Sequence, residues 1–484
     1  MRMSEPLVRN VPRPVAQGLG GRRVLVLGLG ETGLSVARWV ARQGGTPVVA
    51  DNRANPGRAH LLGELVPEAS LRLGPFSPDL LSGIDLLAIS PGLALTEAIV
   101  QMALQQDIPV VGEIELFAWH VRNHDSSRIL AITGTNGKTT TTALTGEILR
   151  TAGLNCEVAG NIGPSALAAL MARMDHGNPP AIWVLELSSY QLETTWSLDA
   201  DAAVMLNLSE DHLDRYAALE DYGAAKARIF LGHGAQVVNR DDPYSASLSI
   251  PDREYVSFGL GVPPRDADFG LRQIRDQRWL SQGDNAFLNS ENLRILGTHN
   301  TSNALAACAL ARLAGASYSN LADGLNTFPG LPHRMQRVST RNGVVWFNDS
   351  KGTNIGATKA ALEGSAAIIN AVSPSGKALL ILGGEGKGQD FSELSNAVRR
   401  HASRVLLIGR DAPLIESALA ATGGVPIVRC QSLEEAVSRA ERHARPGDWV
   451  LLSPACASFD MFRDYAHRGE TFVAAVHDLE GKGS

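Results

Sequence analysis

The sequence has little cysteine and few aromatic residues: four cysteines in 484 residues, and 5% Phe, Trp and Tyr together. Cys156, Cys308, Cys430 and Cys456 lie far apart and form no C-x-x-C pair, so neither a zinc knuckle nor a disulfide framework is expected. An excess of basic residues is also absent, because 44 Lys and Arg stand against 50 Asp and Glu, for a formal net charge of −6. Nucleic acid is therefore not expected as the main partner.

Long hydrophobic runs are missing as well. The Ala-rich stretch 304–316 is short and contains Arg312, whereas a membrane-spanning helix needs ~20 apolar residues. The first residues contain arginines and prolines but no continuous apolar segment, so we expect no secretory signal and interpret 1–21 as a flexible lead-in. These features predict a cytoplasmic protein without membrane insertion. The length predicts roughly two to four domains at ~100–200 residues each.

Short Val/Ile/Leu runs alternate with helical segments along nearly the whole chain, a pattern typical of α/β proteins with parallel sheets. Three such series can be separated, and their first strands are expected at 22–28, 128–133 and 343–347. The polar stretch HVRNHDSS at 120–127 and the cluster FPGLP at 328–332 are the breakpoints between them.

The strongest local signal is TGTNGKTTTT at 133–142, directly after an expected strand and before an expected helix. A glycine-rich turn at a helix N-terminus directs backbone N–H groups toward a phosphate. Lys138 is expected to reach the β- and γ-phosphates, and the Thr139 hydroxyl to bind Mg²⁺. The match to the general P-loop is incomplete, because Ile132 stands where that pattern has glycine. An ATP site is nevertheless favoured over an ordinary strand-to-helix turn.

A second glycine motif, Gly28-x-Gly30-x-x-Gly33, follows the first strand, and Asp51 ends the next one. This spacing satisfies the dinucleotide-binding fingerprint, so an NAD(P)-linked oxidoreductase is an alternative function. Two phosphate-binding turns on consecutive domains instead favour ATP-driven chemistry on a nucleotide-like substrate.

The expected roles of three further side chains differ when each is considered alone. Glu186 ends the strand at 181–187, at the sheet edge where ligands bind, and could hold a second Mg²⁺. His212 follows the next strand at the same edge, and a ligand or an ordinary capping histidine are equally expected there. Lys226 lies in a helix, where a solvated surface position is the default interpretation. Lys351 in NDSKGTN and Lys387 in GGEGKG are likewise interpreted as exposed turn lysines.

Together these segments resemble the Mur ligase family, within it the branch that adds D-glutamate. The resemblance runs from about residue 22 to the C-terminus. The matching segments occur in the family's order: GLGETG at 28–33, SPG at 90–92, TGTNGKTT at 133–140, GNIG at 160–163, ELSSYQLE at 186–193, SEDHLDRY at 209–216, HNTSNALAA at 299–307, GLPHRM at 330–335, NDSKGTN at 348–354, GGEGKG at 383–388 and SPACASFD at 453–460.

The resemblance implies three domains: an N-terminal Rossmann-like domain at 1–122 for the UDP end of the substrate, a central P-loop ATPase-like domain with a parallel sheet at 123–330, and a C-terminal Rossmann-like domain at 331–484 for the amino acid. It implies an ADP-forming ligase that activates UDP-N-acetylmuramoyl-L-alanine as an acyl phosphate and joins it to D-glutamate, in peptidoglycan precursor synthesis. Small-molecule substrates, ATP and two Mg²⁺ ions are then the expected partners of a monomer.

The resemblance also implies the role of individual residues. The sugar nucleotide is expected at Gly30, Glu31, Thr32, Gly33, Asp51, Arg53, Gly92 and Asn161. ATP is expected at Gly134, Thr135, Asn136, Gly137, Lys138, Thr139, Thr140, Asn300, Asn303, Arg334 and Asp349, with His333 adjoining them. D-Glutamate is expected at Thr353, Lys387, Ser458, Phe459 and Tyr465. Mg²⁺ is expected at Thr139, Glu186, His212 and a carbamylated Lys226. The catalytic residues are expected to be Lys138, His212 and Lys226.

Three other functions compete with this one. A folylpolyglutamate synthase shares the P-loop variant. An oxidoreductase would not explain the phosphate-binding segment TGTNGKTT. An ATPase that moves a partner would release ADP without any amino acid.

Overall fold

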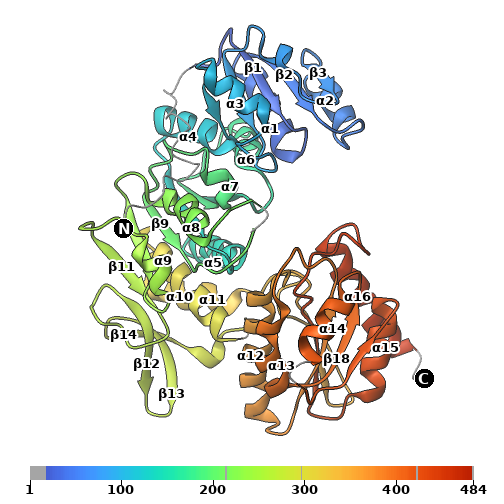
Figure 1. The fold of residues 1–484 in the computed structure, drawn as a ribbon. Helices are drawn as coiled ribbons and strands as arrows, with labels where there is room; N and C mark the ends of the chain where they lie inside the picture. Colours follow the sequence, from blue (N-terminus) through green and yellow to red (C-terminus); the bar gives the residue numbers. More distant parts are fainter. Residues whose placement is uncertain (1–17, 213–214, 296, 421–422, 482–484) are drawn as a thin grey trace. The chain divides into compact units, whose positions relative to one another are not determined.

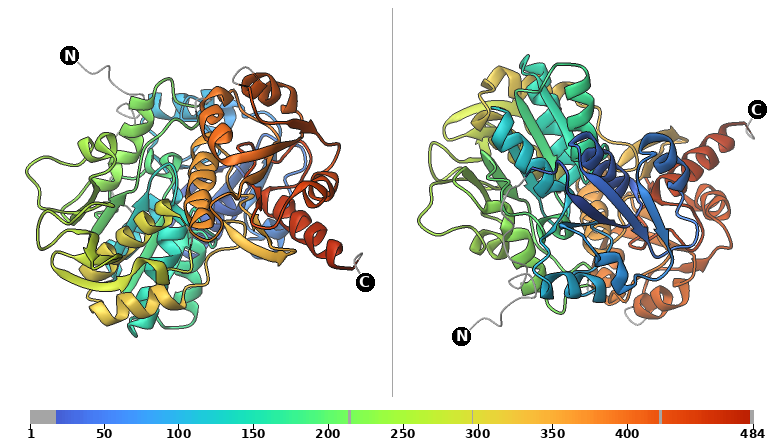
Figure 2. Two further views of the ribbon diagram at one scale, coloured as in Figure 1. Left: turned by 90° about the horizontal axis from the view of Figure 1, so that it is seen from below. Right: turned by 90° about the horizontal axis from the view of Figure 1, so that it is seen from above.

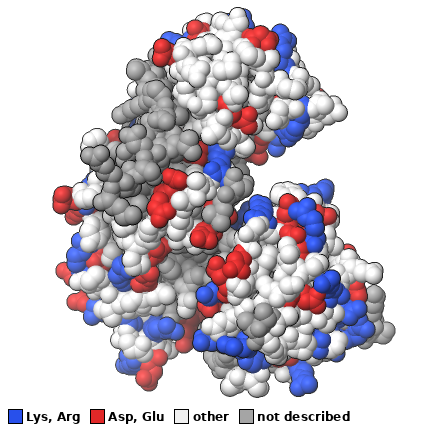
Figure 3. All heavy atoms as spheres, in the orientation of Figure 1, with Lys and Arg blue, Asp and Glu red and all other residues white. Residues whose placement is uncertain are grey.

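The computed structural model describes residues 18–212, 215–295, 297–420 and 423–481, and it contains three sheets in chain order, each covered by helices (Figure 1). The predicted α/β class with N-terminal, central and C-terminal sheets is confirmed. The expected lead-in at 1–21 lies almost wholly outside the described residues. Among the helices that are described, none is long and apolar enough to cross a membrane. Lys and Arg are interspersed with Asp and Glu over the face drawn in Figure 3.

The N-terminal sheet has five parallel strands in the order β3-β2-β1-β4-β5. Its strands are β1 (Arg23–Leu27), β2 (Thr46–Asp51), β3 (Ser70–Leu73), β4 (Leu86–Ile89) and β5 (Val110–Val111). Its helices are α1 (Glu31–Arg42), α2 (Ala59–Leu65), the 3₁₀ turn η2 (Pro78–Leu81), α3 (Ala98–Gln105) and α4 (Glu113–His124). Alternate β1 side chains are buried on opposite faces, Val24 and Val26 against α1 and Leu25 and Leu27 against α3, which explains the continuous apolar run.

The central sheet has nine strands in the order β14-β13-β12-β11-β10-β9-β6-β8-β7. Its strands are β6 (Arg128–Thr133), β7 (Cys156–Gly160), β8 (Ile182–Glu186), β9 (Ala202–Met205), β10 (Ala235–Asn239), β11 (Tyr255–Phe258), β12 (Phe269–Ile274), β13 (Gln277–Gln282) and β14 (Asn285–Asn289). Strands β6 to β11 are parallel, whereas β12 and β13 form an antiparallel hairpin that the parallel pattern does not predict. The helices of this region are α5 (Lys138–Thr151), α6 (Ala166–Asp175), α7 (Ser189–Leu192), α8 (Leu219–Ala227), η3 (Arg228–Phe230), α9 (Pro243–Ser247), η4 (Ser290–Asn292), α10 (Thr298–Leu313) and α11 (Tyr318–Thr327).

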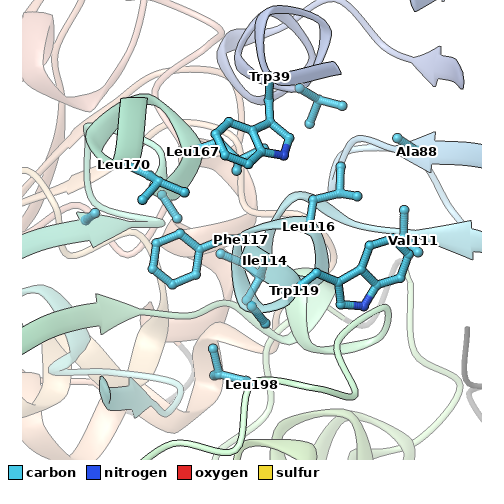
Figure 4. Packing of buried hydrophobic residues seen from close by; sticks show 14 of the residues in the cluster. Trp39, Ala88, Val111, Ile114, Leu116, Phe117, Trp119, Leu167, Leu170 and Leu198 are labelled. Carbon is cyan, nitrogen blue, oxygen red and sulfur yellow. The ribbon is translucent and has the colours of Figure 1, made fainter. Parts of the chain in front are cut away.

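One apolar cluster joins the N-terminal and central sheets. Figure 4 shows Trp39 of α1, Phe117 and Trp119 of α4, and Leu167 and Leu170 of α6 packed together. The ring of Phe117 meets that of Trp183 in β8 edge to face, with centroids 5.1 Å apart. The described chain divides into two compact units, and the first, which comprises the residues up to Leu288 and Ala304–Leu325, holds both of these sheets.

The second compact unit comprises Asn289–Asn303 and the residues from Asn326 onward. Its sheet has the order β15-β16-β20-β17-β18-β19, with only the edge strand β15 antiparallel to its neighbour. The elements are β15 (Gln336–Arg341), β16 (Val344–Asn348), α12 (Ile355–Val372), β17 (Ala378–Gly383), η5 (Phe391–Leu394), α13 (Ser395–His401), β18 (Ala402–Ile408), α14 (Ala412–Ala420), β19 (Ile427–Arg429), α15 (Leu433–His443), β20 (Trp449–Leu452) and α16 (Tyr465–Gly481). Helices α12, α13 and α14 cover one face, and α15 and α16 cover the other (Figure 2).

Candidate active site

The turn between β6 and α5 has the backbone of a phosphate-binding loop. Gly134 has φ +147°, and Gly137, the residue before the helix, has φ +85°. Both values lie in the region that favours glycine. A Cβ on Gly134 would also come within 3.0 Å of the Leu206 side chain. The glycines therefore allow the chain to turn tightly and to direct the N-terminus of α5 into the loop.

Two lysine side chains converge on one carbonyl of this loop. Lys138 donates from Nζ to the carbonyl oxygens of Gly134 and Thr135, both at 2.8 Å, and Lys226 donates to that of Gly134 at 2.9 Å. Lys226 is only 1% exposed, so its interpretation as a solvated helix position is wrong. It lies near the end of α8, with Nζ 4.6 Å from the ring centroid of Tyr222. Burial, and secondarily the charge of Lys138, lower the pKa of Lys226 well below its usual value.

Glu186 ends β8 directly beside β6, as predicted, and its side chain is buried. Its Oε1 accepts a hydrogen bond from Nδ2 of Asn161 at 2.7 Å. Its Oε2 is buried and has no hydrogen-bond partner among the described residues. Because an unpartnered buried carboxylate oxygen is costly, this atom fits a site for a cation. Glu186 and Lys226 also interact electrostatically.

His212 lies in the loop after β9 at a φ of +57°. Its side chain is 35% exposed, and its ring centroid is 4.9 Å from that of Tyr190 and 6.1 Å from that of Tyr222. The contacts with these two tyrosine rings therefore limit the orientations that the imidazole can adopt.

A pocket of about 570 Å³ opens where the N-terminal sheet meets the loops after β7 and β8, within the first compact unit. Glu31, Thr32, Arg53 and Asn161 are among the residues that line it. Of the residues expected around the sugar nucleotide, all line this pocket except Gly33. A Cβ on Gly33 would lie 1.8 Å from the carbonyl oxygen of Gly28, so this glycine is needed for close packing beneath the turn.

Asp51 is buried at the pocket and is fully engaged by the protein itself. Its Oδ1 accepts the backbone N–H and Nε–H of Arg53, and its Oδ2 accepts Nη2–H of Arg53 and the backbone N–H of Leu29. The hydrogen bonds from Arg53, foremost, lower the pKa of Asp51 to about 2. A carboxylate offers about four acceptor positions. This carboxylate therefore shapes the turn and holds Arg53, and none of those positions is left for a ribose hydroxyl.

The remaining residues expected to bind ATP lie in the second compact unit. Asn303 donates to Oδ1 of Asn300 at 3.2 Å, and both side chains are buried. Asp349 follows β16 and accepts from the Ser453 hydroxyl and the Met335 backbone N–H. Burial raises the pKa of Asp349 to about 6. His333, at a φ of +62°, has its Nδ1 3.0 Å from Nδ2 of Asn348.

The residues expected to bind D-glutamate lie on loops and at one helix start of the same unit. Ser458 is buried, whereas Phe459 is 68% exposed. Tyr465 is the first residue of α16. Its ring packs against Lys351, whose Nζ lies 3.7 Å from the ring centroid. Lys387 has a φ of +52° in its turn, and the Thr353 N–H donates to the Lys351 carbonyl.

Sequence reasoning missed Arg468, which joins two of these loops. The side chain is fully buried and donates to Ser350 in NDSKGTN and to the carbonyl oxygens of Cys456 and Ala457 in SPACASFD. Nothing in the local pattern of α16 distinguishes this arginine, because all of these acceptors are distant in sequence.

Glu113, at the start of α4, was missed for the same reason. Its Oε1 accepts from the Leu167 N–H at 2.8 Å and the Ser35 hydroxyl at 3.4 Å, so it joins α4 to α6 and α1. Its Oε2 is buried without a hydrogen-bond partner among the described residues. Burial raises the pKa of Glu113 to about 7.

Comparison with known proteins places this geometry in a family. Family models match residues 22–112 (Mur ligase MurD-like, N-terminal domain), 132–311 (Mur ligase middle domain) and 333–456 (Mur ligase, glutamate ligase domain). The UDP-N-acetylmuramoylalanine–D-glutamate ligase of Nitrosospira multiformis is 50% identical over 466 residues, covering 96% of each chain. That of Nitrosomonas europaea is 49% identical over 468 residues, covering 96% of this chain and 97% of its own.

The fold agrees with these matches. The structure of the UDP-N-acetylmuramate–alanine ligase of Thermotoga maritima superposes with a TM-score of 0.61 at 19% identity, covering 95% of this chain and all of that one. All three family models occur in order, and relatives near half identity extend over almost the full length. The chain therefore belongs to the Mur ligase family, as its motifs predict.

Proposed function

We propose that this chain is an ATP-dependent ligase that adds D-glutamate to UDP-N-acetylmuramoyl-L-alanine in peptidoglycan precursor synthesis. The observation that carries the proposal is the convergence of Lys138 and Lys226 on the P-loop carbonyl of Gly134, beside Glu186. Asn161 both lines the large pocket and hydrogen-bonds Glu186. This hydrogen bond connects the pocket wall to the carboxylate beside the phosphate-binding strand, which supports transfer between two ligands. The relatives near half identity carry the name of this activity.

The reaction has two steps. An oxygen of the L-alanyl carboxylate attacks the γ-phosphorus of ATP, the bond to the β,γ-bridging oxygen breaks, and ADP leaves. The amine nitrogen of D-glutamate then attacks the acyl carbon, loses its proton, and phosphate departs with the electron pair of the acyl C–O bond. Lys138 neutralises negative charge on the transferring phosphoryl group, and the N–H groups of the loop orient it.

Magnesium fits the residues around Glu186. Thr139, Glu186, His212 and a carbamylated Lys226 would hold two ions, and the unpartnered Oε2 of Glu186 is the atom that most requires one. Bound there, Mg²⁺ would neutralise the charge that spreads over the phosphoryl oxygens.

The surroundings of Lys226 support its carbamylation. Among the described residues its Nζ donates to two neutral oxygens, the Gly134 carbonyl and the Thr133 hydroxyl, in a buried setting that favours an uncharged amine. An uncharged amine attacks CO₂, the N–C bond forms, and one proton is released. The product is a carboxylate, which is a better magnesium ligand than an amine.

In the sugar-nucleotide pocket, Gly30, Thr32, Arg53 and Gly92 contact the uridine diphosphate, while Asp51 and Gly33 shape the turn. Glu31 uses its backbone, since its side chain is 54% exposed and lies 3.7 Å from Arg58. Further ATP contacts are assigned to Thr135, Asn136, Thr140, Asn300, Asn303, Arg334 and Asp349. D-Glutamate contacts are assigned to Thr353, Lys387, Ser458, Phe459 and Tyr465. We assign the protein to the cytoplasm, as a monomer. Its role in cell-wall synthesis links it to cell growth and division. We place its domain boundaries near residues 122 and 330.

The saturated acceptor positions of Asp51 weigh against the oxidoreductase, because its fingerprint needs that carboxylate for a ribose hydroxyl. The deciding experiment measures ADP release by the purified protein with Mg²⁺-ATP, UDP-N-acetylmuramoyl-L-alanine and one amino acid at a time. Release should require both the nucleotide and D-glutamate, and L-glutamate should not replace it. Release without an amino acid would indicate an ATPase, and a requirement for a folate would indicate a folylpolyglutamate synthase.

A further inference from the structure

Arg215 connects the wall of the sugar-nucleotide pocket to the loop that carries His212. We propose that Arg215 is a positioning residue, which transmits binding of the sugar nucleotide to the imidazole of His212 and so to the Mg²⁺-ATP site. This inference rests on the proposed function, because it assigns a coupling between that function's two ligands.

On the pocket side, the guanidinium holds two backbone carbonyls. Nη1 donates to the carbonyl oxygen of Leu93 at 2.9 Å and to that of Pro91 at 3.2 Å. Both residues line the pocket, and Gly92 lies between them. A Cβ on Gly92 would meet nothing within 4 Å, so this stretch of backbone faces open space. A ligand that contacts the backbone here also shifts the two carbonyl groups that accept hydrogen bonds from Arg215.

On the other side, the same guanidinium is fixed to Glu193, the residue that follows α7. Nη2 donates to Oε2 of Glu193 at 2.5 Å, and Tyr216 donates from its hydroxyl to Oε1 of that carboxylate at 2.7 Å. The side chains of Arg215 and Glu193 are only 13% and 6% exposed. Such a shielded, charge-assisted pair holds its geometry far better than a surface ion pair does.

Arg215 is connected to His212 in two ways, through a tyrosine ring and through the backbone. The Arg215 guanidinium carbon lies 4.3 Å from the ring centroid of Tyr190, whose ring packs against the imidazole of His212. The backbone N–H groups of Arg215 and Tyr216 also donate to the carbonyl oxygen of His212, at 2.9 and 3.1 Å. A displacement of the guanidinium therefore moves both the turn that bears His212 and the ring against which its imidazole packs.

All of these residues lie in the first compact unit. The planar guanidinium makes contacts in three directions at once: to the carbonyls, to the carboxylate and to the ring face. A lysine can supply the charge but not this fork. The coupling therefore requires arginine at position 215.

The test measures a coupling factor rather than activity alone. The Kd of a non-hydrolysable ATP analogue with Mg²⁺ is determined by calorimetry, with and without saturating UDP-N-acetylmuramoyl-L-alanine. Coupling between two ligand sites commonly corresponds to about a 5- to 150-fold change in affinity. We expect a ratio in this range for the unmodified protein, a ratio near one for Arg215→Ala, and an intermediate ratio for Arg215→Lys.

Two further variants separate coupling from folding. Arg240→Ala is the matched control, because Arg240 is also partly buried in the first compact unit and donates to backbone carbonyl oxygens, those of Gly259, Gly261 and Phe269, but does not line the pocket. Its coupling factor should stay at the unmodified value. Tyr190→Leu keeps Arg215 but removes the ring between it and His212, and it should lower the factor even if Arg215→Ala does not fold.

The inference is overturned if Arg215→Lys and Tyr190→Leu retain the full factor, or if the unmodified protein turns over but shows no coupling. It is also overturned if a folded Arg215→Ala keeps the full factor, or if Arg240→Ala lowers the factor equally, since any partly buried arginine would then suffice. Failure of the unmodified protein to bind either ligand would instead contradict the proposed function.

Discussion

The buried carboxyl of Glu113 predicts a specific dependence of stability on pH. In the unfolded chain the carboxyl has an ordinary pKa of 4.5, whereas in the folded protein burial raises the pKa to about 7. Between these values the folded state binds the additional proton, so rising pH removes stability, and the loss is complete above the folded pKa. At ~1.4 kcal/mol per pH unit, the full loss is about 3 kcal/mol, of which about 2 kcal/mol falls between pH 5.5 and 8.

The change that tests this is Glu113→Gln, which keeps an oxygen to accept from the Leu167 N–H and cannot ionise. Chemical denaturation of both proteins at pH 5.5 and pH 8 should show that the variant loses less stability over this interval than the unmodified protein, by about 2 kcal/mol. Because other groups titrate in both proteins, only this difference between the two losses is interpreted.

Glu115→Gln is the matched control. Glu115 is buried two residues along α4, but both of its oxygens have donors: Trp119 Nε1–H on one, and the Trp196 and Ser197 N–H groups on the other. Its variant should be less stable than the unmodified protein at both pH values, because a buried hydrogen-bond acceptor is altered. Parallel curves for Glu113→Gln and the unmodified protein would refute the assignment of the shift to burial of Glu113.

Three further predictions concern the site directly. Lys138→Ala should leave the circular dichroism spectrum unchanged while turnover falls by about 10²-fold or more, because the charge on the phosphoryl group is no longer neutralised; an unchanged rate would contradict the P-loop assignment. Lys226→Ala should be inactive, and short-chain carboxylic acids should partly restore ADP release by replacing the carbamate; no restoration would count against the carbamate alone. Gly33→Ala should weaken sugar-nucleotide binding measured by calorimetry, because its Cβ would lie 1.8 Å from the Gly28 carbonyl oxygen and must displace the turn; unchanged affinity would show that the turn relaxes freely.

Parallel strands such as β1, β6 and β8 were predictable because each is a short apolar run that is buried on both faces. The expected strand at 128–133 coincides with β6, and that at 22–28 contains β1, Arg23–Leu27. The hairpin of β12 and β13 was not foreseen, since its strands mix polar and apolar residues and pair with each other directly rather than through a crossover. The glycine motifs were also readable, because positive φ and close backbone approach restrict those positions to one residue type.

The α/β class, the phosphate-binding turn and the family can be recognised from the amino-acid chain alone, because periodicity and glycine spacing are local properties of the chain. Packing of the chain was needed to show that Lys226 is buried against the loop, that both Asp51 oxygens are hydrogen-bonded, and that Arg215 holds the carbonyl oxygens of Pro91 and Leu93. Those properties depend on partners that are distant in sequence and meet only when the chain packs. Burial and hydrogen-bond partners, which set the charge state and the role of a polar side chain, are not encoded by its neighbours.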